Sequence, residues 1–221
     1  LRKSADLALY RAKGDGRGNY RFFEKGMDAT MQHRRLLESG LKLGLTRGEF
    51  SLVFQPLMEL ESNRVSCFEA LLRWDNAELC VVSPVEFIPV AEEIGFIVPL
   101  GEWVLREACR VAATWPGETR IAVNLSPVQF KSRRLLDVVR DALQEAGLSP
   151  NRLELEITES VMLADSEQTL ETLHDLRAMG VRISMDDFGT GYSSLSYLRA
   201  FPFDKIKIDR SFIEDVGSTD A

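Results

Sequence analysis

From residue 49 onward, short runs with strand-like alternation take turns with amphipathic stretches of helix length. This order is typical of an α/β fold with a parallel sheet. The runs that predict strands are residues 51–55, 65–74, 121–125, 153–158, 182–187 and 204–209. The stretches that predict helices are residues 84–93, 100–115, 127–146, 166–179 and 193–198. The pattern predicts a TIM-like (β/α)8 barrel with about six of its eight strands present, because a whole barrel takes about 250 residues.

The residues before this region are too few to make a domain. Residues 1–23 combine a helical pattern, closed by glycines, with a short strand at 20–23. Residues 25–45 predict a polar helical connector. Its apolar stripe consists of Met27, Met31, Leu37 and Leu41. We interpret it as an ordinary amphipathic helix rather than as a membrane-binding one.

The predicted strands carry apolar residues on one face and polar residues on the other. In residues 153–158 the leucines and the isoleucine share one face, whereas Glu154, Glu156 and Thr158 share the other. An antiparallel sheet with one solvated face gives the same alternation, but the helix-length spacers favour a parallel barrel. The polar face then points to the barrel interior or its upper rim. Carboxylates there are costly unless they are paired or bind cations, so the strands predict a metal site or a salt-bridge network.

The candidate metal ligands are all oxygen donors. They are Glu69, Asn124, Glu156, Asp186 and Asp187. Oxygen ligands without His or Cys select Mg²⁺ or Mn²⁺ over zinc. Adjacent aspartates point to opposite sides of a regular strand, so a shared role for both requires the strand to end or twist there. The following Gly189 and Gly191 favour such a break.

Lys207 lies at the end of the last predicted strand and on its polar face. It can act as a counter-ion to the carboxylates, or as a Schiff-base lysine in an aldolase-like barrel. The neighbouring acids keep the lysine protonated. A protonated lysine suits the orientation of water or phosphate and opposes imine chemistry.

Composition narrows the classes of function. The chain has 27 Lys and Arg against 34 Asp and Glu, a formal net charge of −7, whereas a broad DNA- or RNA-binding surface is normally basic. No apolar run approaches the ~20 residues of a membrane span, so we expect no membrane contact in this segment. The three cysteines lack metal-ligand spacing. The simplest interpretation is reduced thiols in a cytoplasmic protein.

At several of these positions the sequence resembles the EAL family of cyclic di-GMP phosphodiesterases, which are built on a TIM-like barrel. The segment Phe68-Glu69-Ala70-Leu71-Leu72-Arg73-Trp74 is similar to the family signature. Further segments match in the expected order: residues 54–56, 83–89, 124–126, 154–160, 186–194 and 207–209. The ordered set covers about 170 residues from residue 49 to the end of the chain, so it is far more specific than the three letters Glu-Ala-Leu.

The resemblance implies hydrolysis of one phosphodiester bond of cyclic di-GMP to give the linear dinucleotide pGpG. It assigns two Mg²⁺ or Mn²⁺ ions to the five oxygen-donor residues, with Glu69, Asp187 and Lys207 in the catalytic set. Lys207 would help to hold the attacking water and the phosphate. Gln55 and Arg73 would contact the substrate. Glu159 would tether the loop 187–194, which links the site to the contacts of a homodimer.

The opening segment, residues 5–17, is similar to the tail of a GGDEF diguanylate cyclase domain. We therefore divide the chain into a GGDEF tail (1–24), a helical connector (25–47) and an EAL domain (48–221). Two later motifs of the family, which carry a Glu and a Gln of its metal and water network, do not occur before residue 221. We expect the chain by itself to be weak or inactive, within a longer protein that is a phosphodiesterase. The alternative is a receptor module that binds cyclic di-GMP without cleaving it.

Overall fold

The computed structural model describes residues 20, 22, 27–163, 167–189, 201 and 203–212. Its strands form one sheet in the order β1-β2-β4-β5-β6-β7, with β3 paired to the other edge of β2. The strands are β1 (Phe50–Glu59), β2 (Arg64–Asn76), β3 (Cys80–Val82), β4 (Arg120–Leu125), β5 (Leu153–Thr158), β6 (Arg182–Phe188) and β7 (Lys205–Ile208). The helices are α2 (Met27–Arg47), α3 (Pro84–Glu93), α4 (Ile97–Ala112), α5 (Pro127–Phe130), α6 (Leu135–Ala146), α7 (Glu159–Leu163) and α8 (Glu167–Ala178), with 3-10 turns η1 (Pro150–Arg152) and η2 (Arg210–Phe212).

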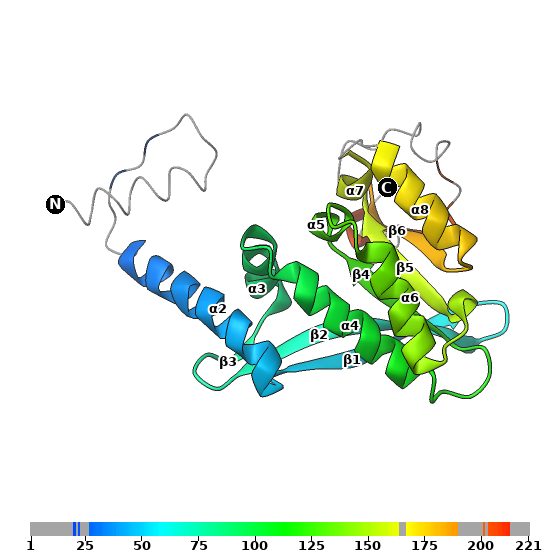
Figure 1. Ribbon diagram of the computed structural model, residues 1–221, viewed down its shortest axis with the longest axis horizontal. Helices are drawn as coiled ribbons and strands as arrows, with labels where there is room; N and C mark the ends of the chain where they lie inside the picture. Colours follow the sequence, from blue (N-terminus) through cyan, green and yellow to red (C-terminus); the bar gives the residue numbers. More distant parts are fainter. Residues whose placement is uncertain are drawn as a thin grey trace, which may run out of the picture.

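Strands β2, β4, β5, β6 and β7 are parallel neighbours. Helices α4, α6 and α8 cover one face of this curved sheet, as Figure 1 shows. The predicted class, a partial barrel of alternating strands and helices, is confirmed. All six predicted strands occur close to their expected bounds.

The first strand pair differs from the parallel arrangement that we expected. Strands β1 and β2 form an antiparallel hairpin in which Gln55 lies opposite Glu69. Only residues 60–63 connect them, whereas a parallel pair needs a crossover of a dozen residues or more. Asn63 takes the left-handed conformation (φ 51°) that tight turns require.

Other elements also differ from the prediction. The predicted helix 127–146 is divided into α5 and α6, and Ser126 begins α5 with a capping box to Gln129. Strand β3 and helix α7 were not predicted, because three and five residues are too few to show a period.

The apolar faces of the strands form the core beneath the helices. Ile121, Val123 and Leu125 of β4 are at most 4% exposed and pack with the apolar faces of α4 and α6. The alternating polar residues therefore point to the concave side of the sheet, as predicted. This arrangement places charged side chains of several strands within reach of one another.

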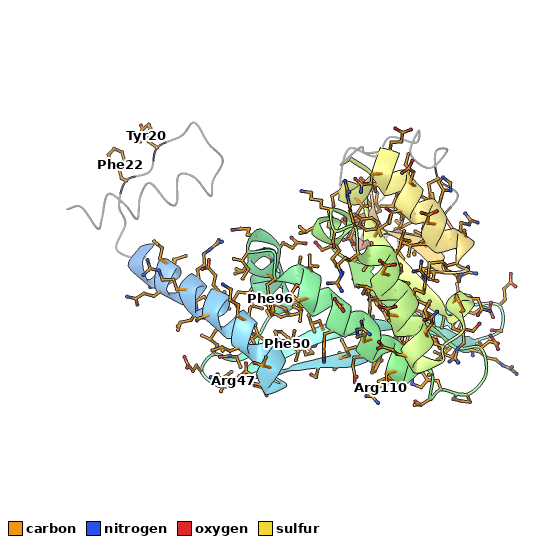
Figure 2. The ribbon with its side chains drawn as sticks, viewed as in Figure 1. Tyr20, Phe22, Arg47, Phe50, Phe96 and Arg110 are labelled. Atoms are coloured by element: carbon orange, nitrogen blue, oxygen red, sulfur yellow. The ribbon has the colours of Figure 1, made fainter. Side chains whose placement is uncertain are left out.

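Helix α2 packs against the β1–β2 hairpin through a second core. Leu37 and Leu41, two members of the predicted stripe, are buried beside Phe50 and Trp74. Figure 2 shows Phe50 where the end of α2 meets the hairpin. The connector helix is thus packed against the β1–β2 hairpin, at the start of the sheet.

Several expectations fall outside the described residues. They are the helical pattern at the start of residues 1–23, the helix 193–198 and the last residues of the loop 187–194. Of the strand expected at 20–23 only residues 20 and 22 are described, and neither is in a strand. Among the described helices, none is both long and apolar enough to cross a bilayer.

Candidate metal and substrate site

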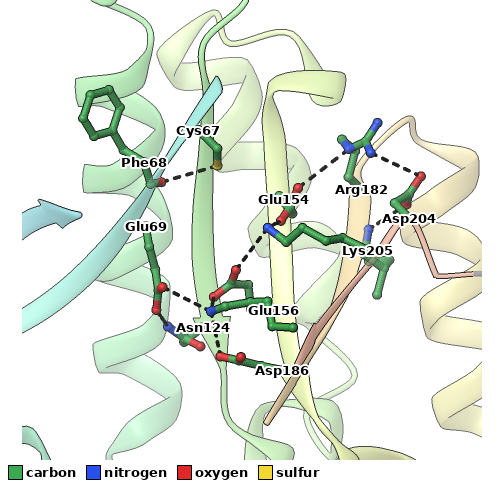
Figure 3. A network of polar contacts seen from close by, with 12 residues as sticks. Cys67, Phe68, Glu69, Asn124, Glu154, Glu156, Arg182, Asp186, Asp204 and Lys205 are labelled. Atoms are coloured by element: carbon green, nitrogen blue, oxygen red, sulfur yellow. Dashed lines mark hydrogen bonds and ion pairs between the residues drawn. The ribbon is translucent and has the colours of Figure 1, made fainter. Parts of the chain in front are cut away.

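Side chains from five parallel strands meet on the concave side of the sheet. These are Glu69 of β2, Asn124 of β4, Glu156 of β5, Asp186 of β6 and Lys207 of β7. Figure 3 shows the labelled members of the group converging from their separate strands. The alternation of each strand places these residues on one face of the sheet. Asn124 is paired directly with Glu156, whereas Glu69 and Asp186 lie two residues out of register with these neighbours.

Lys207 lies at the centre of three carboxylates. Its Nζ is 3.1 Å from Glu69 Oε2, 2.7 Å from Glu156 Oε2 and 2.9 Å from Asp186 Oδ2. One oxygen of each acid lies within 4.8 Å of those of the other two. Asn124 Nδ2 donates a 2.8 Å hydrogen bond to Glu69 Oε1. Four of the five expected ligands therefore share a centre.

Burial sets the electrostatics of this cluster. Glu156 is 1% exposed. Burial raises the pKa of Glu156 to about 7, although the hydrogen bond and charge of Lys207 act to lower it. Burial alone would lower the pKa of Lys207, but its contacts with Glu156 and Asp186 outweigh that effect and raise it. Lys207 is therefore a protonated lysine, which is unsuited to imine formation.

Asp187 follows the break in β6 that the adjacent aspartates require. Met185 pairs with Ile206 and Phe188 with Ile208, so β6 has one more residue than β7 between these pairs. Asp187 itself has a φ of 52°. Its side chain is exposed and lies outside the three-carboxylate group. Partial desolvation of its carboxylate, then the charges of Asp186 and Asp209, raise the pKa of Asp187.

The two expected substrate contacts lie beside the cluster. Gln55 is exposed and is paired directly with Glu69 across the β1–β2 hairpin. Arg73 is on the same face of β2 as Glu69 and is half-buried. It lines a cavity of about 380 Å³ that extends from Asn124 toward α3 and α4.

Glu159 contacts the segment that follows the two aspartates. Its Oε1 accepts a 2.8 Å hydrogen bond from the backbone N–H of Gly189. Gly189 has a φ of 105°, and a Cβ there would lie 2.4 Å from the Phe212 ring. Only glycine fits this position without displacing its neighbour. Glu159 therefore contacts the start of the loop, and its role as a tether stays a prediction.

The donor set fits divalent cations of the Mg²⁺ type. Its members are carboxylate and amide oxygens, which hard cations prefer. Oε1 of Glu156 is buried and has no hydrogen-bond partner among the described residues. A buried carboxylate oxygen normally has a partner, so an oxygen without one is consistent with a place for a cation.

Sequence reasoning missed two supports of the site. Ser126 Oγ donates a 2.7 Å hydrogen bond to Glu92 of α3, which joins α3 to the residues that follow Asn124. Lys205 contacts both Glu154 and Glu156. A long-range contact leaves no periodic signal, but the polar position of Lys205 on an alternating strand could have indicated the second one.

Residues 37–221 match the EAL domain family. The chain therefore belongs to the EAL domain family. It is 45% identical over 218 residues to the bifunctional diguanylate cyclase/cyclic di-GMP phosphodiesterase MucR of Pseudomonas aeruginosa, covering 97% of this chain and 32% of MucR. It is 40% identical to the cyclic di-GMP phosphodiesterase NbdA of the same species, covering 99% of this chain and 28% of NbdA. The chain thus spans about a third or less of these relatives.

Solved structures agree with this assignment. The PaMucR phosphodiesterase in complex with c-di-GMP has a TM-score of 0.77 and 44% identity, over 82% of this chain and 75% of that one. The cAMP-bound EAL enzyme Bd1971 has a TM-score of 0.79 and 30% identity, over 86% and 55% of the two chains. The chain is homologous to cyclic di-GMP phosphodiesterases and has their fold.

Proposed function

We propose that this domain hydrolyses one phosphodiester bond of cyclic di-GMP and releases linear pGpG. The observation that carries the proposal is the convergence of Glu69, Glu156 and Asp186 on one lysine at the concave side of the sheet. The relationship to MucR and NbdA supports the choice of substrate. The alternative function, binding of cyclic di-GMP without cleavage, predicts a different outcome in the assay below.

The oxygen donors would hold two Mg²⁺ or Mn²⁺ ions: Glu69, Asn124, Glu156, Asp186 and Asp187. When bound, such ions would increase the acidity of the attacking water and neutralise charge on the phosphoryl oxygens. Lys207 carries the fixed positive charge of the site and is placed to orient the water and the phosphate. No side-chain nucleophile is needed, and the carboxylates would pair with cations rather than repel a dianionic substrate.

Arg73 and Gln55 would bind the substrate on the β1–β2 side. The planar guanidinium of Arg73 can donate two parallel hydrogen bonds to a phosphate. Its place in the wall of the cavity leaves room for a base between β2 and α3. Gln55 faces the same side as Glu69.

The direct test is conversion of cyclic di-GMP to pGpG by the protein that carries this chain, with Mg²⁺ or Mn²⁺ and followed by chromatography. Product formation that stops with EDTA and returns with excess metal supports the proposal. Tight binding of cyclic di-GMP without product would support the receptor function instead. Neither binding nor product would contradict both.

The raised pKa of Glu156 predicts pH-dependent metal binding. Cation and proton compete for this carboxylate, so affinity falls as pH drops through the folded pKa of about 7. A group of that pKa is about one-tenth ionised at pH 6 and nine-tenths at pH 8. We expect Mn²⁺ to bind about tenfold more weakly at pH 6 than at pH 8. Calorimetry with correction for buffer protonation measures both affinities. Equal affinities at both pH values would show that Glu156 is ionised throughout.

Glu159→Ala is expected to lower kcat more than it raises KM. The substitution frees the backbone N–H of Gly189 and so loosens the segment after Asp187, without removing a ligand or a substrate contact. By analogy with other outer supports of metal sites, kcat should fall about 10- to 100-fold, with KM within about threefold. Glu159→Gln keeps an acceptor oxygen and is expected to retain most of the turnover. Equal losses in kcat and KM would contradict the tether, and with it the proposed route to a dimer contact.

A further inference from the structure

A buried ion pair lies next to the carboxylate cluster, on the same face of the sheet. Glu154 of β5 precedes Glu156 by two residues and is 1% exposed. Its Oε1 contacts the ammonium group of Lys205 of β7, and its Oε2 is 3.7 Å from Arg182 Nε. The same Lys205 Nζ is 3.6 Å from Glu156 Oε1. Figure 3 shows Lys205 reaching across β6 to these two glutamates.

The register of the sheet explains how Lys205 reaches them. Ser184 of β6 is paired with Glu156 on one side and with Lys205 on the other. Ser184 is completely buried, and its side chain is short. The aliphatic part of Lys205 can therefore cross β6 and bring its charge to β5. A larger residue at this position of β6 would occupy that path.

The two oxygens of Glu156 face two different lysines. Oε2 accepts a 2.7 Å hydrogen bond from Lys207. Oε1 is buried and has no hydrogen-bond donor among the described residues, and Lys205 provides a positive charge on that side. The terminal torsion of a glutamate is soft, so contacts at both oxygens decide the orientation of its carboxylate plane.

We propose that Lys205, held in place by Glu154, is a positioning residue that orients the Glu156 carboxylate toward the cation site. This inference rests on the proposed metal-dependent function. Among the described residues, the ion pairs of Lys205 are with Glu154 and Glu156, whereas Lys207 also contacts Glu69 and Asp186. The action of Lys205 on the site therefore passes through Glu156.

Two simpler roles for Lys205 predict other effects of its removal on metal binding. If Lys205 acted only through its charge, it would repel a divalent cation, and its removal would strengthen metal binding. If it served only to compensate Glu154, its removal would lower stability without a specific loss of metal affinity. Orientation of Glu156 alone predicts weaker metal binding in a folded protein. Metal affinity therefore separates the three roles.

The test measures Mn²⁺ affinity by calorimetry in the protein that carries this chain, with no nucleotide present. Lys205→Met should weaken Mn²⁺ binding about 10- to 100-fold, the range for outer supports of metal ligands. Lys205→Arg, which keeps the charge, should bind within about threefold of the parent. Lys42→Met, an exposed lysine of α2, is the matched control and should change nothing.

A second variant covers the case in which Lys205→Met leaves the buried Glu154 with Arg182 but without its lysine, and the protein does not fold. The double change Glu154→Gln with Lys205→Met keeps the net charge and removes the pair. Circular dichroism establishes folding, and the double variant should show the same loss of affinity. Unchanged or tighter Mn²⁺ binding in a folded variant would overturn the proposal.

The outcomes also separate this inference from the proposed function. A parent protein that binds no Mn²⁺ would overturn both. A parent that binds Mn²⁺ but makes no pGpG would contradict the proposed function, and the Lys205 variants would still be judged by affinity. A parent that binds and hydrolyses, with Lys205→Met equal to it, would overturn the positioning role alone.

Discussion

Glu69→Ala is expected to lower kcat/KM for cyclic di-GMP by ~10³-fold or more. Glu69 takes part in the cluster through both oxygens, since Oε1 accepts from Asn124 and Oε2 contacts Lys207. Its loss removes a cation ligand and a partner of two further site residues at once. Loss of a single stabilising donor in an active site already costs about 10²- to 10³-fold, so a shared ligand should cost at least as much. Initial rates of pGpG formation at saturating Mn²⁺ measure the effect.

The matched control is Glu61→Ala. Glu61 lies in the turn of the same hairpin and is exposed, so its removal changes net charge equally but leaves the cluster intact. We expect turnover within about twofold of the parent, in line with the small effect of surface substitutions. Retention of more than about a tenth of the activity by Glu69→Ala would show that Glu69 is not an essential metal ligand. It would contradict the proposed site at its central residue.

The strands and the site were predictable because both depend on a short period. Alternation identified the polar face of β5 and placed Glu156 on it. Parallel pairing then placed Glu156 directly beside Asn124, with Asp186 two residues further along β6 on the same face. Residues that share a face and a level of neighbouring strands must lie close together. The convergence of ligands from β2, β4, β5 and β6 follows from this geometry and from the correct assignment of the crossovers.

The rest depended on features without a period. The direction of β1 is set by a turn of four residues, 60–63, and not by the alternation, which is the same in either direction. The long helix is divided at residues 131–134, between α5 and α6, where the sequence has neither glycine nor proline. The approach of Lys205 to Glu156 depends on the small side chain of Ser184 between them. Each is a tertiary choice that overrides the local pattern.

The position of Arg73 links the site to the connector helix, because the next residue of β2 points the opposite way, into the core beneath α2. Trp74 is completely buried. Its ring stacks on Phe50 with centroids 5.5 Å apart and meets Phe87 edge-on at 5.4 Å. Because side chains alternate along β2, Arg73 points to the site and Trp74 points to the core beneath α2. A change in the packing of Trp74 is therefore expected to affect the direction of Arg73.

Trp74→Ala is expected to destabilise the protein by about 3–5 kcal/mol, the usual cost of removing a large buried aromatic side chain. The substitution removes the surface on which α2 rests: a Cβ at Gly40 would lie only 3.0 Å from the indole. It also removes the 3.1 Å hydrogen bond from Trp74 Nε1 to Glu49 Oε2. Urea unfolding followed by circular dichroism measures the change. Trp74→Phe keeps the aromatic packing and loses the hydrogen bond, so it should cost about 1–2 kcal/mol. A loss below about 1 kcal/mol for Trp74→Ala is typical of a surface substitution. It would mean that the packing of α2 on Trp74 contributes little to the stability of the protein.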